Sequence, residues 1–557
     1  MIKKILALLV LIVGMTTFFG PKLIFGQEEN INLPEVIITG EDKSIFKEEE
    51  RSKPGKEKAI EELSKEAQKE VFSKERQEKS SQSEKEKLKE EEKREEEKEK
   101  RFTSSSFTLS YGTFETLFYE HLFGQQTRPM NYLLKMRPGN RSSGFSLSHD
   151  ERVFDEYNRS AFDLEAKIRS KEKIGLEGSF GFYEEKRALP YLSSDFDAKK
   201  ALGINFSLGG KLFLSSMTEL AFKGTFSENS FSLLLNEREK QEDEGQIVGA
   251  DLRLNTLWKK KFPISLTARV FQEKFKQEYQ ASSIYIEANR LKKQPVVINA
   301  KVGWDHRDKN PSISKAGFAV EVLCPYHEKA LFFVHAKKSL NNPTSTTLYL
   351  KKDYVWISEE LVSPEEILDI SLGASYRLGA LSLITLTLFG KEVKDFIVWE
   401  DSGDTDPRLF KPVNIKGGKA RFRGATCELK HHLGKELIYQ AKYTYTETEN
   451  KDEEKVVPHT PEQYLLTSLT YAGKRDYEIV LSYELVSSRY SKEDPKEKKK
   501  DLPAYSLLSL RMSKGITDSL NLFLEGRNLL NEDKAYKLDK SYPLRGREIE
   551  VGVKVKF

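Results

Sequence analysis

The last ten residues constrain the fold of this chain most strongly. Apolar side chains alternate there with charged or small ones, and a period of two puts the two sets on opposite faces of a β-strand. A soluble sandwich would give the same pattern. A closed outer-membrane barrel, with lipid outside and water inside, also accounts for a final aromatic without a tail. The apolar set is Ile549, Val551, Val553, Val555 and Phe557, and the other set is Glu548, Glu550, Gly552, Lys554 and Lys556.

The chain from Phe102 onward consists of short alternating segments rich in Leu, Phe, Tyr, Ser and Gly. At roughly 20 residues per strand and its turn, residues 102–557 accommodate about 22 strands. The sequence therefore predicts an all-β fold, a closed antiparallel transmembrane β-barrel of about 22 strands. Clear examples are Phe107–Tyr111, Ala161–Ile168, Ile174–Tyr183, Ile264–Phe271 and Leu381–Leu388.

Connections between these segments alternate in length toward the C-terminus. Short turns face the periplasm and long loops face outside in such barrels, so the alternation predicts the orientation. The predicted long loops are Asn531–Arg547, Ser488–Leu502, Glu449–Pro461 and Asp401–Gly418. The predicted short turns are Ser513–Thr517, Gly473–Arg475, Leu433–Glu436 and Leu378–Ala380. The segment Gly303–Pro311 is interpreted as a polar connection, with Trp304 at a membrane interface.

The N-terminal part divides into three segments. Residues 1–26 are typical of a cleaved signal peptide, with Lys3 and Lys4 before an apolar run that is short for a membrane span. Residues 27–42 contain a β-prone run after a proline. Residues 43–101 are rich in Lys and Glu and cannot bury enough apolar surface to fold as a compact domain. We expect a charged tether, disordered or partly helical, whose apolar stripe is Ile60, Leu63, Ala67 and Val71.

A series of C-terminal motifs resembles the TonB-dependent outer-membrane receptor family. The sequence Gly526–Asn531 is followed by Ala535-Tyr536 and by Tyr542–Arg547 before the last strand. Upstream, Tyr443–Thr446 and Val457–Glu462 stand in the order that the family shows. The resemblance implies an outer-membrane transport protein for a small, unidentified ligand. It also implies that the barrel-assembly machinery recognises the final strand, which ends at Phe557.

The segment after the signal resembles the TonB box, the extended strand through which such receptors contact the energy-transducing TonB protein. Its residues are Pro34, Glu35, Val36, Ile37, Ile38, Thr39 and Gly40. A receptor of this family should continue into an α/β plug domain, but the charged tether follows instead. Two hypotheses stay open: a TonB-coupled transporter, closed by a plug from another chain or by the tether, and a passive plug-less channel or structural barrel.

The remaining residues give no reason to expect an enzyme, a cofactor or a metal site. Cys324 and Cys427 are far apart and fit neither a disulfide framework nor a zinc site. His431 and His432 are adjacent, so a strand would point them to opposite faces. No local catalytic group of Ser, His and Asp stands out. A net charge of +4 over 557 residues does not suggest a nucleic-acid partner.

Overall fold

The computed structural model describes the chain from Phe102 to Lys556 with interruptions, mostly at strand connections. Residues 1–101 and Phe557 lie outside the described part, and with them the predicted signal, the TonB-box-like segment and the tether. The described ranges are 102–112, 116–127, 130–142, 157–169, 174–188, 198–215, 217–235, 238–258, 262–275, 277–288, 296–308, 312–326, 329–344, 348, 362–379, 381–401, 410–415, 419–434, 436–450, 456–473, 477–491, 500–532, 544 and 546–556.

Twenty-two strands form one antiparallel sheet, as the sequence predicts. The first half comprises β1 (Phe102–Gly112), β2 (Thr116–Thr127), β3 (Met130–Ser142), β4 (Tyr157–Arg169), β5 (Ile174–Ala188), β6 (Ala198–Ser215), β7 (Thr218–Leu235), β8 (Arg238–Trp258), β9 (Phe262–Phe275), β10 (Gln277–Ala288) and β11 (Val297–Arg307). The second half comprises β12 (Ile313–Tyr326), β13 (Ala330–Asn341), β14 (Glu365–Leu378), β15 (Ser382–Lys394), β18 (Lys419–His432), β19 (Leu437–Asn450), β20 (Gln463–Gly473), β21 (Tyr477–Val486), β22 (Tyr505–Thr517), β23 (Leu520–Arg527) and β24 (Glu548–Lys556).

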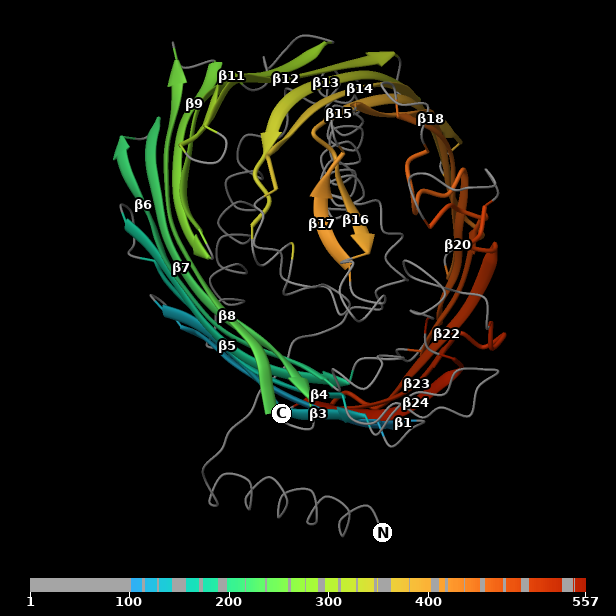
Figure 1. The fold of residues 1–557 in the computed structure, drawn as a ribbon. Coiled ribbons are helices and arrows are strands. Elements are labelled where there is room, and N and C mark those ends of the chain that lie inside the picture. The colour runs from blue at the N-terminus through green and yellow to red at the C-terminus, as the bar shows by residue number, and fades with distance from the viewer. Residues whose placement is uncertain are drawn as a thin grey trace, which may run out of the picture.

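The sheet closes on itself because β1 also pairs with β24 (Figure 1). Phe107 lies opposite Val555 and Gly112 lies opposite Glu550. At this seam the hydroxyl of Ser110 donates a hydrogen bond to the carboxylate of Glu550. Closure leaves no strand edge unpaired, which is the condition for a sheet to exist in lipid.

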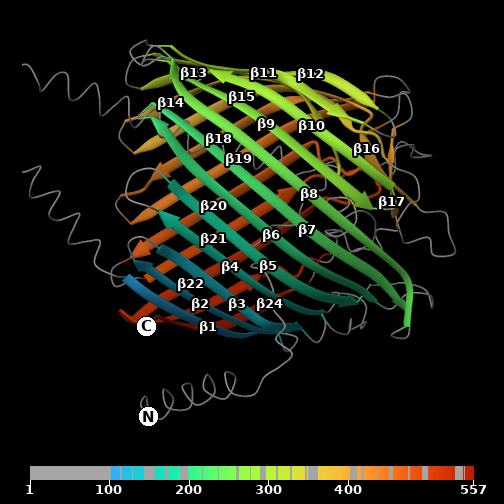
Figure 2. The same ribbon diagram turned by 90° about the vertical axis from the view of Figure 1, so that its left-hand side faces the viewer.

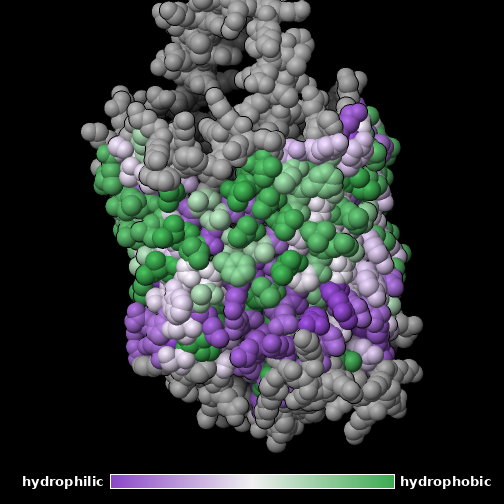
Figure 3. All heavy atoms as spheres, turned by 90° about the horizontal axis from the view of Figure 1, so that it is seen from above, coloured by the Kyte–Doolittle hydropathy of each residue, from purple (hydrophilic) through white to green (hydrophobic). Residues whose placement is uncertain are grey.

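The wall has an apolar outer face. Trp304, Ile549 and Val551 are 52%, 40% and 57% exposed. Their neighbours along the strands, such as Asp305 and Glu550, lie on the lumen side, where they pair with other polar residues. Figure 3 shows apolar residues in a band across one side of the barrel, with a hydrophilic belt at one end. Among the described residues, no helix has the length and apolar composition needed to cross a membrane.

Connection lengths agree with the predicted alternation, with three corrections. The turn predicted at Ser513–Thr517 is wrong, because these residues belong to β22 and the connection is 518–519. The segment Gly303–Pro311 is not a connection at its start, since β11 continues to Arg307. The loop predicted at Asp401–Gly418 begins at residue 395 and contains a two-stranded hairpin, β16 (Ile397–Asp401) and β17 (Phe410–Asn414).

The hairpin is the main departure from a simple wall. It pairs only with itself and lies inside the ring of strands when the barrel is viewed along its axis (Figure 1). Seen from the side, it lies near the end of the barrel opposite the C-terminus (Figure 2). That end carries the long loops, so the hairpin is at the predicted external mouth.

Candidate functional site in the barrel lumen

Both faces of the β16–β17 hairpin are apolar, which explains why it leaves the wall and enters the lumen. Successive residues of a strand point to opposite faces. Ile397 and Trp399 pack on one side, whereas Phe396 and Val398 pack on the other. A strand that is buried on both faces needs a layer on each side, and here one layer is the wall itself.

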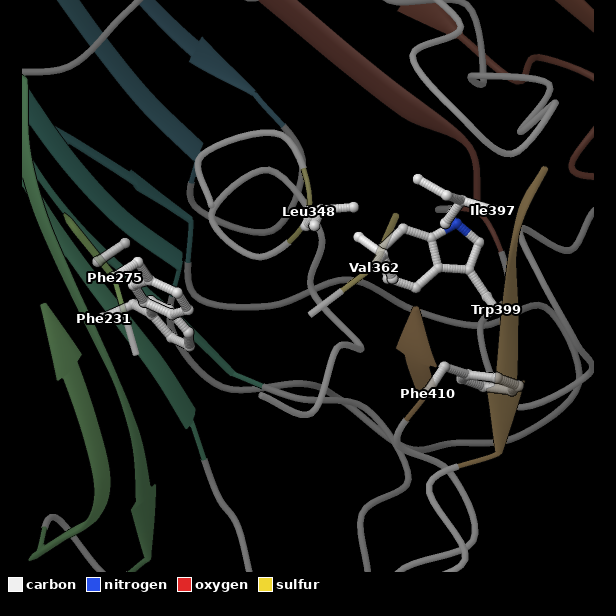
Figure 4. Packing of buried hydrophobic residues seen from close by; sticks show 8 residues of the cluster. Phe231, Phe275, Leu348, Val362, Ile397, Trp399 and Phe410 are labelled. Atoms are coloured by element: carbon white, nitrogen blue, oxygen red, sulfur yellow. The ribbon is translucent and has the colours of Figure 1, made fainter. Parts of the chain in front are cut away.

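The first face of the hairpin packs in a cluster that reaches the wall at β6, β7 and β9. Phe231 of β7 and Phe275 of β9 stack with ring centroids 6.1 Å apart on the wall. Figure 4 shows these two rings on one side, and Trp399 and Phe410 on the hairpin. The whole cluster comprises Ala201, Phe231, Phe275, Leu348, Val362, Ile397, Trp399 and Phe410.

The second face packs on β15 and β18. The ring of Phe396 meets the ring of Phe422 edge to face, with centroids 5.5 Å apart. Val457, from the connection between β19 and β20, joins the same cluster. Apolar burial on this scale stabilises a hairpin that forms no ladder of backbone hydrogen bonds with the described wall strands. The cluster comprises Val393, Phe396, Val398, Ile415, Ala420, Phe422 and Val457.

Hydrogen bonds from one asparagine fix the base of the hairpin. The side chain of Asn414 donates to the carbonyls of Ser363 and Asp395, at 3.1 and 2.6 Å, and accepts from the backbone N–H of Ser363. Glu365 accepts from the N–H of Ile397 at 2.9 Å and from Asn341 at 2.8 Å. The hairpin is therefore tied to the neighbouring loop between β13 and β14.

That neighbouring loop is held to the wall by a buried aromatic and a buried arginine. Tyr279 of β10 donates to the carbonyl of Pro343 at 3.1 Å and to the carboxylate of Glu273. Arg307 of β11 is 1% exposed and donates to the carbonyl of Val362 at 3.4 Å. Residues at both ends of the loop are thus bonded to adjacent wall strands.

A second pair of loops is anchored elsewhere on the rim. Arg489 and Leu502 exchange backbone hydrogen bonds at 2.9 and 3.1 Å, and the N–H of His459 donates to the carbonyl of Tyr490. The Arg489 guanidinium lies over the ring of Tyr505. Burial lowers the pKa of Arg489, although Tyr505 and Glu484 act in the opposite direction. These contacts fix the two loops to each other and to β22.

The lumen side of the last strand carries charged residues, as the alternating pattern of its sequence predicts. Arg527 forms ion pairs with Glu525, Glu548 and Glu550 at 2.9, 3.6 and 4.0 Å. Of the predicted assembly-signal residues, Ile549 and Val551 are exposed on the outer face, and Val553 and Val555 are half-buried. Phe557 and the predicted partner-binding residues Pro34 to Gly40 lie outside the described residues.

Sequence reasoning missed the hairpin and its anchors. The run Phe396–Trp399 is apolar and could have indicated burial, but the predicted polar loop begins only at Asp401 and no element was predicted for this run. Tyr279, Arg307 and Asn414 carry no motif. Within the described part of the chain, no group of His, Cys, Asp and Glu could hold a metal ion. His431 instead pairs with Ser382, 2.6 Å from Nδ1 to Oγ.

Comparisons with known proteins agree with this architecture. The sequence model of the family described as "TonB dependent receptor-like, beta-barrel" matches residues 101–529. No curated protein sequence matches the chain.

Solved structures of high similarity include the ferric enterobactin receptor PfeA from Pseudomonas aeruginosa, at 12% identity and a TM-score of 0.65. The copper transporter OprC has 12% sequence identity and a TM-score of 0.66. The comparisons with PfeA and OprC each cover 82% of this chain and 80% of the other chain. The ferric-catecholate import receptor Fiu from E. coli has 10% sequence identity and a TM-score of 0.63, and the comparison covers 82% of both chains. At these identities the likeness shows the fold, and the family match shows membership. This chain belongs to the TonB-dependent receptor-like β-barrel family of bacterial outer-membrane transport proteins, which are not enzymes.

Proposed function

We propose that this protein moves a small ligand across the outer membrane in a gated, TonB-coupled way. The observation that carries the proposal is the β16–β17 hairpin, which packs across the external mouth and is tied to the loop between β13 and β14. An unobstructed barrel of 22 strands would enclose a water-filled lumen that does not select its solutes. A mouth that is closed by folded loops fits a protein that admits its ligand selectively.

The names of the solved neighbours suggest which ligands to test first. They are described as receptors or transporters for ferric enterobactin, ferric catecholate and copper. Metal chelates are therefore the first candidates for this chain. The lumen face offers both signs of charge for such ligands, as in the Arg269–Asp251 and Arg253–Glu287 pairs at 2.5 and 3.7 Å.

The N-terminal segments complete the proposal. Residues 1–26 export the chain and are cleaved, and Pro34 to Gly40 bind the TonB protein as an added β-strand. The alternating set Ile549, Val551, Val553, Val555 and Phe557 is recognised by the barrel-assembly machinery. The charged tether at residues 43–101 lets the TonB-binding segment reach into the periplasm.

Titration of a peptide against a TonB C-terminal domain tests the coupling. A peptide of residues 29–42 should bind, and Ile37→Pro should abolish binding because proline removes a backbone donor and blocks strand pairing. Ile37→Val is the matched control and should bind like the original peptide. Absence of binding, or binding unchanged by Ile37→Pro, would leave the passive channel as the better reading.

A further inference from the structure

An apolar patch lies on the lumen face of the wall, far from the external mouth. It consists of Val297 of β11, Leu323 of β12, and Leu331 and Phe333 of β13. Val297 pairs with Leu323, and Leu323 pairs with Phe333, so these three side chains form one row across adjacent strands. Asp305 and Arg307 share the face of Val297 along β11, and Arg307 bonds the inward-folded loop, so the row faces the lumen.

The patch lies at the periplasmic end of these strands. Val297 and Leu331 are at the starts of β11 and β13, and Leu323 is near the end of β12. Those ends lie on the side of the short connections, away from the β16–β17 hairpin. The patch therefore belongs to neither loop cluster described above.

The burial of the patch requires a second layer. Its four residues are only 9%, 6%, 1% and 2% exposed, in the order Val297, Leu323, Leu331 and Phe333. A single sheet leaves its inner face open unless another element covers it. Among the residues that the structure describes, this cluster contains wall residues alone. If water filled the lumen at this place, the exposed apolar surface would cost about 25 cal/mol of free energy per Å².

The wall around the patch is shaped for an amphipathic element. Phe333 lies flat against the wall because Gly373 faces it: a Cβ at Gly373 would come within 2.4 Å of the ring. The next row toward the mouth is polar, with Asn299, Glu321 and His335 in register. Asn299 donates to Glu321 at 2.9 Å. An apolar row bordered by a polar row matches one face of an amphipathic helix.

We infer that the patch binds the apolar stripe Ile60, Leu63, Ala67 and Val71 of the chain's own N-terminal segment, so that the tether itself fills the periplasmic side of the lumen. The stripe recurs at helical spacing within a Lys- and Glu-rich sequence, so its other face is polar. No other stretch of residues 43–101 has four apolar residues at this spacing.

The length of chain before the barrel allows this arrangement. β1 begins at Phe102 on the periplasmic side, and β11 to β13 lie across the ring from β1 and β24 (Figure 1). A barrel of 22 strands spaced 4.8 Å apart and tilted by about 40° is about 45 Å wide. The stretch from Val71 to Phe102 could span up to about 100 Å if extended. The stripe can therefore cross the lumen and still leave Pro34 to Gly40 free upstream.

Disulfide crosslinking of the full-length protein in detergent tests the inference. In a background with Cys324→Ser and Cys427→Ser, the pair Leu63→Cys and Leu331→Cys should crosslink within one molecule under mild oxidation. The matched control combines Lys65→Cys with Leu331→Cys, because Lys65 is 200° from Leu63 around a helix. We expect at least a fivefold higher crosslinked fraction for the Leu63 pair. Heat-modifiable migration in gels shows whether the barrel is folded in each of the two double-cysteine variants.

The wall position is varied so that one misfolded variant does not decide the test. Leu323→Cys replaces Leu331→Cys in a second pair, with the same control at Lys65. Equal crosslinking by Leu63 and Lys65, or no crosslinking in folded barrels, would overturn the inference and point to a separate plug chain. The result does not depend on TonB binding, which concerns Pro34 to Gly40 alone, so failure of the proposed function would be recognised separately.

Discussion

The guanidinium of Arg307 lies over the ring of Tyr279, with its Cζ 4.0 Å from the ring centroid. Both side chains are buried on the lumen face, and each donates a hydrogen bond to a carbonyl near one end of the loop between β13 and β14. Because that loop is bonded to the base of the β16–β17 hairpin, this contact connects the wall to the hairpin inside the lumen.

Arg307→Met should loosen the mouth. A desolvated cation–π contact contributes about 2 kcal/mol, and a hydrogen bond from a charged group about 1.5–3 kcal/mol. We expect faster hydrogen exchange at the amides of Asn342, Thr344, Val362 and Ser363, by tenfold or more. Arg269→Met is the control, since Arg269 also lies on the lumen face but pairs with Asp251 of the neighbouring wall strand β8. Unchanged exchange in the Arg307 variant would show that other contacts hold the loop.

Asn414→Ala should release the base of the hairpin. The substitution removes three partly buried hydrogen bonds to Ser363 and Asp395, each of which contributes about 0.5–1.5 kcal/mol. Amides of Ile397–Asp401 should exchange faster, while those of β18 should not. Asn205→Ala, on the wall of β6, is the comparison variant. Similar exchange rates in both variants would show that Asn414 does not hold the base of the hairpin.

The wall of this barrel could be predicted from sequence, whereas its interior could not. Alternation in segments such as Glu548–Lys556 is a local signal, because lipid and water impose a period of two on every strand. Trp399 belongs to a cluster whose wall members, Phe231 and Phe275, come from strands more than a hundred residues earlier. Polar residues beyond Asp401 also made this region look like an ordinary solvated loop. Nothing local could indicate such partners.

Gly303→Ala should destabilise the barrel where Gly390→Ala should not. A Cβ at Gly303 would come within 2.0 Å of the carbonyl oxygen of Ile284 and 2.5 Å of the Tyr285 ring, whereas nothing lies within 4 Å at Gly390. Crowding of this kind costs about 1–3 kcal/mol. The temperature at which the protein loses heat-modifiable migration should fall for Gly303→Ala alone. Equal temperatures would mean that Tyr285 moves aside without cost.

Val553→Arg should impair insertion, because Val553 follows the exposed Ile549 and Val551 on the outer face of β24. Arginine on the lipid face near the midplane costs about 2–4 kcal/mol. The neighbouring Lys554→Gln should insert normally, since that side chain belongs to the lumen set. The folded fraction in outer-membrane preparations measures both. Normal amounts of the Val553 variant would show that the assignment of faces is wrong.

Conductance of the full-length protein in planar lipid bilayers tests the central claim most directly. In the proposed function, the loops anchored by Arg307 and Asn414 close the mouth, so the wild-type protein should show no steady open channel. Variants that combine Arg307→Met with Asn414→Ala should show intermittent openings. A steady, ohmic conductance of the wild-type protein, of the size expected for a water-filled barrel of 22 strands, would contradict gated transport.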